Sequence, residues 1–455
     1  MLEIPTFDFT QENLGDDTSP EQSSHTSNSA AQPKRNSNEE YENYVEIIDD
    51  EFSDECEDSE ILAAIEASLV ESAVQKPGTA QDENDSVKLI LHSFQKNNLD
   101  HTELDENVNI IISRKAIFAT TRRAIGRKRF SFVKPLFGTF AGEEAVDDGG
   151  PKREFFRLLM RAIRESTIFH GSWFSHDLGL LADNRYELAG KLVAWSILQG
   201  GGGPHCLSAV GYEIYKGLAV NHEIAIESVA DPEMKELLQK AAECSTEESF
   251  SALVSKHGDK ISQYGYPKVY ICKLSDRNEM VESLLKQCFL YGVHTEFTQF
   301  FQGLNSIGNL GDIIMGNKAL FDSILGNQHQ RLTKVTFMSL YELYRSEEGS
   351  NKRDKEDSTI YCFEFFLQDL EEGEVNGLTL EDLLVFITGT DFAPLLGFDN
   401  LITIEFYDFD GNSRRRPWSS TCGFHLFLPR GFEDPSDFSS FMKEALLECH
   451  GFGKV

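Results

Sequence analysis

The chain has 455 residues, of which 40% are hydrophobic and 11% aromatic, and its formal net charge is -33. A chain of this length predicts two or three domains, with enough apolar side chains for packed cores. The acidic balance argues against nucleic acid as a partner, because a phosphate backbone is neutralised by basic protein surface.

Cysteine usage and hydropathy indicate the compartment. The cysteines form no Cys-x-x-Cys pair and accompany no histidine cluster, so the sequence predicts no metal site and no cofactor. Scattered thiols are typical of a reducing compartment, so we expect a cytoplasmic or nuclear protein. The first residues contain no signal-peptide core and no apolar run reaches about 18 residues, so we expect no membrane partner.

The first 106 residues predict a disordered acidic tail. Residues 1–60 contain eighteen acidic residues and two basic ones, so a large part of the net charge lies there. Up to about residue 43 most other positions are Ser, Asn, Gln or Thr. Such a composition cannot bury enough apolar surface to offset chain entropy.

A short apolar helix is predicted within this tail, after an acidic run. The residues on one face of the helix are Ile61, Ala64, Ile65, Ser68 and Leu69. Small side chains in the middle of the face allow a partner to approach the backbone. Residues 54–71 resemble a ubiquitin-interacting motif, which implies weak ubiquitin binding by a single helix. An ordinary amphipathic helix docked on the main domain is the alternative.

A second apolar island precedes that helix. Val45, Ile47 and Ile48 are followed by three acidic residues. Residues 45–51 resemble a SUMO-interacting motif, in which an extended apolar strand adds to a sheet edge and the acids meet basic residues at its rim. The resemblance implies SUMO-modified proteins as partners. An apolar island in a disordered tail explains the same residues.

From about Asn107 the composition becomes globular, and predicted strands and helices alternate. Ile110–Ile112 predicts a strand, and Gly142–Phe156 predicts a turn that leads into a helix, because proline suits the first helical turn. Leu188–Ile197 predicts a buried helix. The four glycines at 200–203 predict a flexible helix terminus, since the Gly-Lys-Ser/Thr ending of a phosphate-binding loop is missing.

Residues 346–358 are polar and lie between two apolar segments, which predicts a solvated hinge. We therefore expect an α+β protein with a mostly helical large lobe over residues 107–345 and a small α/β lobe over residues 359–455. A hinge would let one lobe swing relative to the other.

Cys422 is the candidate nucleophile. It follows a Pro-Trp-Ser-Ser-Thr loop and comes just before the strand-like run His425–Pro429. A thiol on the turn before a strand leaves open space for a large covalent cargo. Phe452, fourth from the end of the sequence, supplies an aromatic side chain beyond that strand.

Several motifs, taken in order, resemble HECT-type ubiquitin ligases. They are Gly142–Phe156, Phe297–Leu304, Leu384–Thr390, Pro394–Phe398, Thr421–Cys422 and Phe452. The first resembles Gly-Glu-Glu-Gly-Val-Asp-x-Gly-Gly-x-x-Arg-Glu-Phe-Phe and departs from it only at Ala145. The resemblance covers about residues 107–455, is nearest the group described as G2/M-phase-specific, and implies a bilobal HECT domain.

The resemblance implies a covalent relay. Cys422 would accept the ubiquitin C-terminus from a conjugating enzyme, and a substrate lysine would then attack the new thioester. Thr421 and Phe452 are the further site residues that it implies, Phe452 by ordering the loaded state. The implied partners are a ubiquitin-conjugating enzyme, ubiquitin and protein substrates.

Two alternatives belong to other classes. A cysteine protease needs a base, and His425, three residues along a strand from Cys422, is expected to point to the opposite face. A HECT-like adaptor would bind ubiquitin or SUMO and transfer nothing. Two departures support the adaptor, namely the faint resemblance over Ile226–Cys272 and the pair Gly423-Phe424 where the family usually has Phe-Asn.

Arg414–Arg416 precede the thiol loop. They either raise the positive potential near Cys422, which favours its thiolate, or form a solvated charge run between strands.

Overall fold

The computed structural model describes residues 80–100, 108–143, 149–327, 331–375, 377–394, 396–398, 400–409 and 415–448. The side chains of residues 80–84 are excepted. Both predicted tail motifs, at 45–51 and 54–71, lie outside these residues, and so does Phe452.

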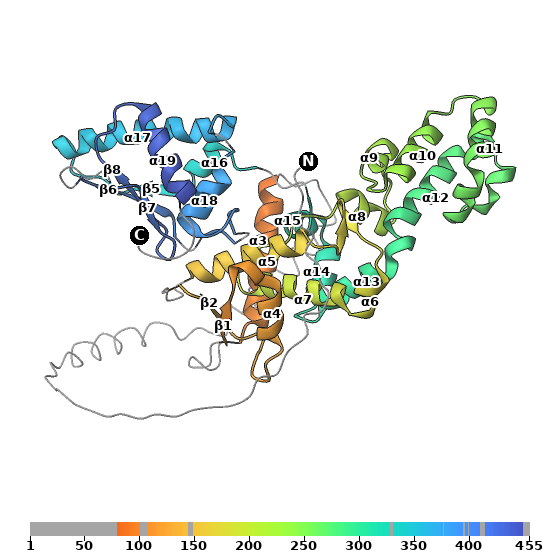
Figure 1. Cartoon of the computed structure of the whole chain (residues 1–455), viewed down its shortest axis with the longest axis horizontal. Coiled ribbons are helices and arrows are strands. Elements are labelled where there is room, and N and C mark those ends of the chain that lie inside the picture. The colour runs from red at the N-terminus through yellow and green to blue at the C-terminus, as the bar shows by residue number, and fades with distance from the viewer. Residues whose placement is uncertain are drawn as a thin grey trace. The chain divides into compact units, whose positions relative to one another are not determined.

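The described part of the chain up to residue 327 is mostly helical (Figure 1). Its α-helices are α3 (Ala80–Asn98), α4 (Ile117–Ile125), α5 (Gly150–Arg164), α6 (Leu178–Ala182), α7 (Arg185–Leu198), α8 (Ala209–Tyr215), α9 (His222–Glu227), α10 (Pro232–Glu243), α11 (Glu247–Gln263), α12 (Arg277–Phe289), α13 (His294–Asn305), α14 (Leu310–Gly316) and α15 (Lys318–Ile324). Short 3-10 helices are η1 (Arg114–Ala116), η2 (Pro267–Ile271), η3 (Leu274–Asp276) and η4 (Tyr291–Val293).

Two small sheets accompany these helices. The strands are β1 (Val108–Ile112), β2 (Leu136–Phe140), β3 (Phe169–His170) and β4 (Trp173–Phe174). β1 pairs with β2 in parallel, and β3 pairs with β4 antiparallel. The predicted strand at Ile110–Ile112 and the predicted helix at Leu188–Ile197 are confirmed as parts of β1 and α7.

The remaining described residues form a four-stranded sheet with helices. These elements are α16 (Lys334–Met338), β5 (Tyr341–Leu343), α17 (Asn351–Glu372), α18 (Leu380–Thr388), β6 (Ile402–Tyr407), β7 (Trp418–Ser420), β8 (His425–Pro429) and α19 (Pro435–Glu448). The strand order is β5-β6-β8-β7, with β7 antiparallel to β8 and the other pairs parallel. The predicted strand at His425–Pro429 and the α+β class are both confirmed.

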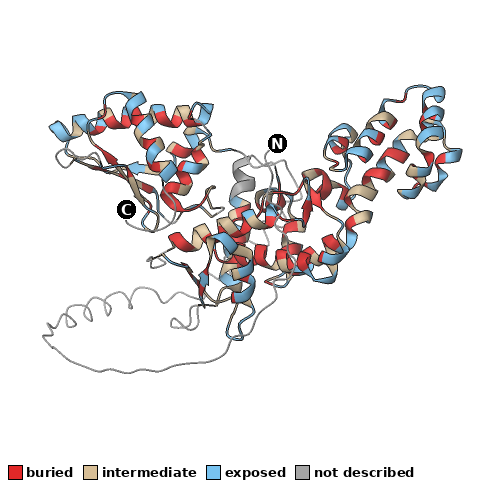
Figure 2. Ribbon diagram, in the orientation of Figure 1, coloured by how far each residue is buried: buried red, intermediate tan, exposed pale blue. Residues whose placement is uncertain are grey.

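Helix α5 positions one side of the site, and its sequence explains where it begins and what it packs against. Pro151 stands in its first turn, where a missing backbone N–H costs nothing. Phe155 and Phe156 are buried and lie with ring centroids 5.6 Å and 5.1 Å from the indole of Trp195 on α7. This aromatic packing fixes α5 on the first core, where Figure 2 shows its buried residues in red.

Two separate clusters of buried hydrophobic residues lie on either side of a boundary near residue 330. The first runs from Val87 on α3 to Leu325, and the second runs from Phe337 to Ala445. We call them the first core and the second core. The first core therefore starts upstream of the predicted residue 107, because α3 contributes buried side chains to it.

The predicted hinge at residues 346–358, and with it the lobe limits at 345 and 359, is wrong. β5 lies upstream of this segment, yet it pairs with β6 inside the second core's sheet. Most of the polar segment is the first part of α17, which begins after the N-cap Ser350. The connection between the cores falls instead between Leu325 and Leu332, the first residue that packs against the second core.

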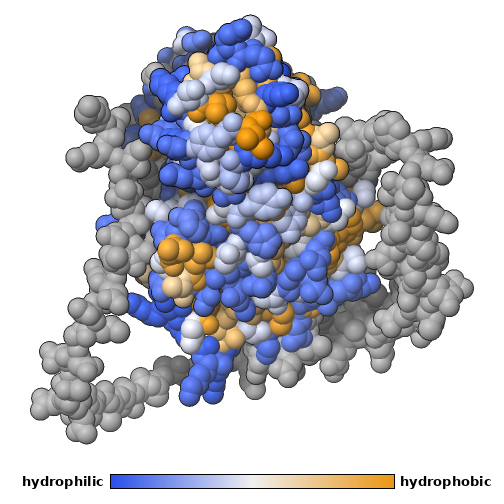
Figure 3. Space-filling view, turned by 90° about the vertical axis from the view of Figure 1, so that its right-hand side faces the viewer, coloured by the Kyte–Doolittle hydropathy of each residue, from blue (hydrophilic) through white to orange (hydrophobic). Residues whose placement is uncertain are grey.

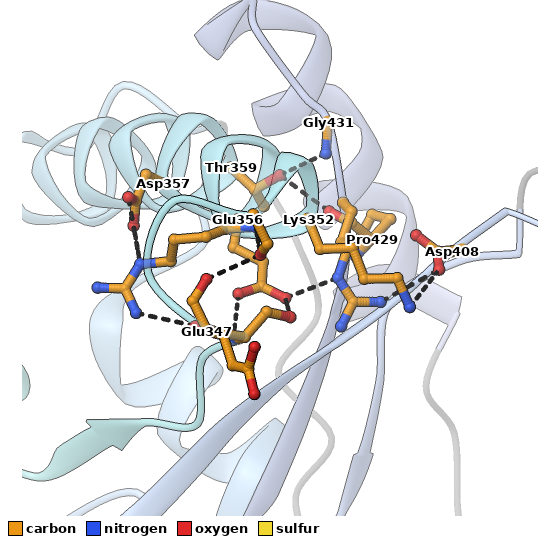
Figure 4. A network of polar contacts seen from close by, with 12 residues as sticks. Glu347, Lys352, Glu356, Asp357, Thr359, Asp408, Pro429 and Gly431 are labelled. Atoms are coloured by element: carbon orange, nitrogen blue, oxygen red, sulfur yellow. Dashed lines mark hydrogen bonds and ion pairs between the residues drawn. The ribbon is translucent and has the colours of Figure 1, made fainter.

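This polar segment contains a buried carboxylate, that of Glu356, whose oxygens accept several hydrogen bonds (Figure 4). Glu356 is fully buried and accepts hydrogen bonds from the Ser346 amide at 2.7 Å, the Ser346 hydroxyl at 2.6 Å and Nε of Arg430 at 2.7 Å. Burial opposes ionisation, but these bonds and the charge of Arg430 outweigh it and lower the pKa of Glu356 below its ordinary value. These bonds link α17 to the segment after β5 and to the residue after β8.

Candidate active site

Cys422 lies on an accessible turn. Residues 421–424 form the turn between β7 and β8, and Cys422 is partly exposed. Among the other described thiols, Cys206, Cys244 and Cys362 are buried, and Cys272 and Cys288 are partly exposed. Burial raises the pKa of Cys206 and Cys362, and that of Cys288 to about 12. Its place on a turn between two strands sets Cys422 apart from these thiols.

The first turn of α5 closes one side of the thiol. A Cβ placed on Gly150 would lie 2.5 Å from Oγ1 of Thr421 and 3.2 Å from Sγ of Cys422. Only a residue without a side chain allows the α5 backbone to come this close to the turn. Cys422 nevertheless remains partly exposed beside this contact.

Arg153, one turn further along α5, joins the two cores. Its Nε donates to the carbonyl of Thr388 at 2.8 Å, at the end of α18, and its Nη2 donates to the carbonyl of Thr421. The guanidinium carbon lies 4.3 Å from the ring centroid of Phe424. A planar cation that donates in two directions and stacks on a ring is suited to this position, and lysine is not.

The glycines after α7 serve close packing. A Cβ on Gly202 would lie 2.0 Å from Cζ of Phe392, which belongs to the loop after α18. The ring of Phe392 also lies 5.7 Å from that of His205. The glycines at the expected flexible helix terminus thus leave space for an aromatic side chain from the loop after α18.

The arginines before the Cys422 turn contact side chains other than Cys422. Arg416 pairs with Glu444 at 3.3 Å and with Glu448, both on α19. The guanidinium carbon of Arg415 lies 3.6 Å from the ring centroid of Trp418, and Arg414 lies outside the described residues. These contacts favour the reading as a charge run between strands over a direct effect on the thiol.

His425 also has another partner. Its Nδ1 lies 2.6 Å from a carboxylate oxygen of Glu405 on the neighbouring strand β6, and its ring stacks on Phe427. This arrangement agrees with the expectation that His425 is not a base for Cys422.

The described residues contain no cluster of three or more side chains that would hold a metal ion, and none of their helices is long and apolar enough to cross a membrane.

The structure brings together some of the predicted site residues. Thr421 and Cys422 lie in one turn, whereas Phe452 and the tail residues lie outside the described part of the chain. Sequence reasoning missed Gly150 and Arg153 as neighbours of the thiol, although both lie in the Gly142–Phe156 motif. Arg153 and its partner Thr421 are 268 positions apart, so no local pattern pairs them.

The chain belongs to the HECT-domain (ubiquitin-transferase) family, which it matches over residues 150–455. The resemblance seen in the sequence motifs is thereby confirmed at the level of the family. The match begins at the first residue of α5 and includes the Cys422 turn.

Similar proteins include the G2/M phase-specific E3 ubiquitin-protein ligases. The chicken protein is 30% identical over 260 residues, which are 56% of this chain and 34% of that protein. The human protein is 26% identical over 299 residues, 64% of this chain and 40% of that protein. The human probable E3 ubiquitin-protein ligase HERC4 is 22% identical over 380 residues, 77% of this chain and 34% of that protein. The chain thus spans between a third and two fifths of the length of these relatives.

Proposed function

We propose that the chain is a ubiquitin ligase that accepts ubiquitin as a thioester on Cys422 and transfers it to lysine amines. The observation that carries the proposal is the partly exposed thiol on the β7–β8 turn of a HECT-family chain. The similar proteins carry the name E3 ubiquitin-protein ligase, which supports the same reaction.

The reaction has two steps, and each transfers the ubiquitin acyl group from one nucleophile to another. The Cys422 thiolate attacks the carbonyl carbon of the thioester between ubiquitin and a conjugating enzyme, a new C–S bond forms, and the conjugating enzyme leaves as a thiolate that takes up a proton. A lysine amine then attacks the new thioester, the isopeptide C–N bond forms, and the Cys422 sulfur leaves while the amine proton passes to solvent. Thiol exchange is nearly balanced in energy, whereas an oxygen ester is less reactive toward an amine.

Movement between the cores belongs to this proposal. One thiol has to face a conjugating enzyme first and a substrate later, so we propose that the two cores act as lobes that move relative to one another. The contacts of Gly150 and Arg153 with the Cys422 turn belong to the docked arrangement.

The test is incubation with activating enzyme, a panel of conjugating enzymes and ubiquitin. A ligase gives an adduct on this chain that thiol reductant removes and that Cys422→Ala lacks. An adaptor that only binds ubiquitin gives no adduct with any conjugating enzyme, and that result would replace the proposal by the adaptor.

The conjugating enzyme is proposed to dock on the part of the first core that includes residues 226–272. Ile271 is 81% exposed and its neighbour Tyr270 is 57% exposed, both on η2 beside α11. Figure 3, viewed from the side of α11 and α12, shows hydrophobic patches set in hydrophilic surface. Exposed apolar and aromatic side chains of this kind are typical anchors of a protein interface.

Ile271→Asp should slow adduct formation at least about tenfold, because a charge at a central anchor must be desolvated on docking. The measurement is the initial rate of adduct formation at a limiting concentration of conjugating enzyme. Val335→Asp is the matched control, since Val335 is 78% exposed on α16 of the second core. Equal rates of adduct formation for Ile271→Asp and the unmodified chain would show that the conjugating enzyme does not dock on this surface.

The acidic tail is proposed to recruit ubiquitin- or SUMO-bearing proteins in the cytosol or nucleus. Changing both Ala64 and Ser68 to Arg should weaken ubiquitin binding by the full chain at least about tenfold, because bulky charges would block close approach to the predicted helix face. Titration of labelled ubiquitin measures the affinity. The control changes Ser27 and Ala30 to Arg, which adds the same charge to the same tail. Unaltered affinity of the first variant would rule out the ubiquitin-interacting motif.

A further inference from the structure

Phe424 holds a backbone conformation that its side chain disfavours. Its φ is 56°, in the left-handed region where a bulky residue crowds its own backbone. It stands two residues after Cys422, in the same turn. A residue in this conformation persists only when its surroundings hold it there, so the turn that carries the thiol depends on contacts around Phe424.

Those contacts come from both cores. Within the second core, the Phe424 carbonyl accepts a hydrogen bond from the Thr403 amide at 2.8 Å, and its ring meets Phe398 edge to face at 5.1 Å. From the first core, the Arg153 guanidinium lies over the same ring at 4.3 Å. Phe424 is only 5% exposed as a result.

Arg153 also holds the other end of the turn. Its Nη2 donates to the carbonyl of Thr421, directly before Cys422, while its guanidinium covers Phe424, two residues after it. One side chain on α5 therefore spans the thiol. A cavity of about 170 Å³, lined by Phe424, Arg153, Leu91 and Leu396 among others, adjoins the ring and gives the turn room to relax.

We propose that Arg153 is a positioning residue for the transfer step, and that Phe424 makes the shape of the Cys422 turn depend on it. When α5 docks against the second core, Arg153 clamps Thr421 and Phe424 and fixes the direction of the sulfur between them. When α5 is withdrawn, the turn relaxes toward the space beside Phe424. This inference deepens the proposed ligase function and rests on it.

The two steps of the reaction use Arg153 differently. In the docked arrangement the α5 backbone at Gly150 lies against the Cys422 sulfur, so a conjugating enzyme gains fuller access when α5 is withdrawn. Loading then takes place without the clamp. Attack by an amine on the loaded thioester needs a defined direction of approach, which the clamp supplies.

Arg153→Ala should therefore slow the discharge of preloaded ubiquitin to free L-lysine at least about tenfold, and should change the loading rate by less than about threefold. Arg153→Lys keeps the charge but loses the planar guanidinium, so it should also slow discharge strongly and change the loading rate little. Arg161→Ala is the control, because Arg161 is exposed on the same helix and pairs with Glu165 at 2.8 Å. Equal losses in loading and discharge would mean that Arg153 serves the fold alone and would overturn the proposal.

Phe424→Asn separates the clamp from ordinary packing. Asn tolerates the left-handed region, so the turn of this variant keeps its shape without help. Arg153→Ala should then cost less than about threefold in discharge in the Phe424→Asn background, against tenfold or more in the parent chain. If Arg153→Ala slows discharge by the same factor in the parent chain and in the Phe424→Asn background, the shape of the turn does not depend on Arg153.

Amide hydrogen exchange at residues 421–424 gives a readout that needs no ligase activity. Arg153→Ala should speed exchange there in the parent chain and leave it unchanged in the Phe424→Asn background. If no conjugating enzyme loads the chain, the proposed function fails while this comparison still decides the role of Arg153. Unchanged exchange in both backgrounds would reject the clamp.

Discussion

Cys422→Ser should trap ubiquitin on the chain and stop its transfer. Serine keeps the shape of the turn but offers an oxygen nucleophile, so any ubiquitin that it accepts is held as an oxygen ester that thiol reductant does not cleave. An amine attacks this ester far more slowly than a thioester, so discharge to lysine should fall at least about a thousandfold. The measurements are gel shift with and without reductant and the rate of lysine modification.

Two controls make this result specific to Cys422. Cys422→Ala should form neither adduct, because alanine has no nucleophile. Cys288→Ser changes another partly exposed thiol, on α12 of the first core and outside residues 226–272, and should load and transfer like the parent. A reductant-sensitive adduct that survives in Cys422→Ala would assign the chemistry to a different sulfur.

Gly150→Ala is the second change with a large expected effect. The new methyl would lie 2.5 Å from Oγ1 of Thr421 and 3.2 Å from Cβ of Thr421, so the Cys422 turn or α5 must move by a few tenths of an ångström or more. Misplacement of reacting groups on this scale costs up to about a hundredfold in rate, and we expect discharge to lysine to fall between tenfold and that limit.

Stability measurements separate this effect from damage to the fold. Alanine is compatible with the first turn of a helix, so Gly150→Ala should not lower the thermal midpoint of unfolding of the first core. Gly316→Ala, on α14, adds the same methyl where no atom lies within 4 Å, and should leave the rate unchanged. A Gly150→Ala chain that transfers as fast as Gly316→Ala would show that the contact with Thr421 plays no part in transfer.

Local patterns were sufficient for several elements. Pro151 marks the first turn of α5, and the strand-like run His425–Pro429 marks β8, because both signals depend on neighbours in sequence. The open position of Cys422 followed from the turn before that strand. Its exposure and the strand pairing that surrounds it agree with this prediction.

The neighbours of the thiol could not be predicted in this way. Gly150 and Arg153 reach the Cys422 turn from another core, across more than 260 positions in the case of Arg153 and Thr421. Gly202 receives Phe392 by the same kind of long-range packing, where composition alone indicated flexibility. Such contacts are set by how two cores meet, and no spacing along the chain encodes them.

The error at residues 346–358 has a different cause. Polar composition indicates solvation only when the side chains are free, and here Glu356 is buried with Ser346 and Arg430 as partners. Helix α17 also has a mostly polar first half and a mostly apolar second half, so the composition changes inside one helix. A change in composition inside one helix therefore resembles the end of a domain.

A pulse-chase experiment with labelled ubiquitin tests the covalent relay most directly. The chain is loaded with labelled ubiquitin, the supply is quenched with an excess of unlabelled charged conjugating enzyme, and L-lysine is added. If Cys422 carries the ubiquitin, label leaves the chain and appears on lysine with the same first-order rate constant, undiluted by the chase. If the lysine product instead carries only unlabelled ubiquitin while the labelled chain stays unchanged, ubiquitin passes directly from the conjugating enzyme and the thiol is not an intermediate.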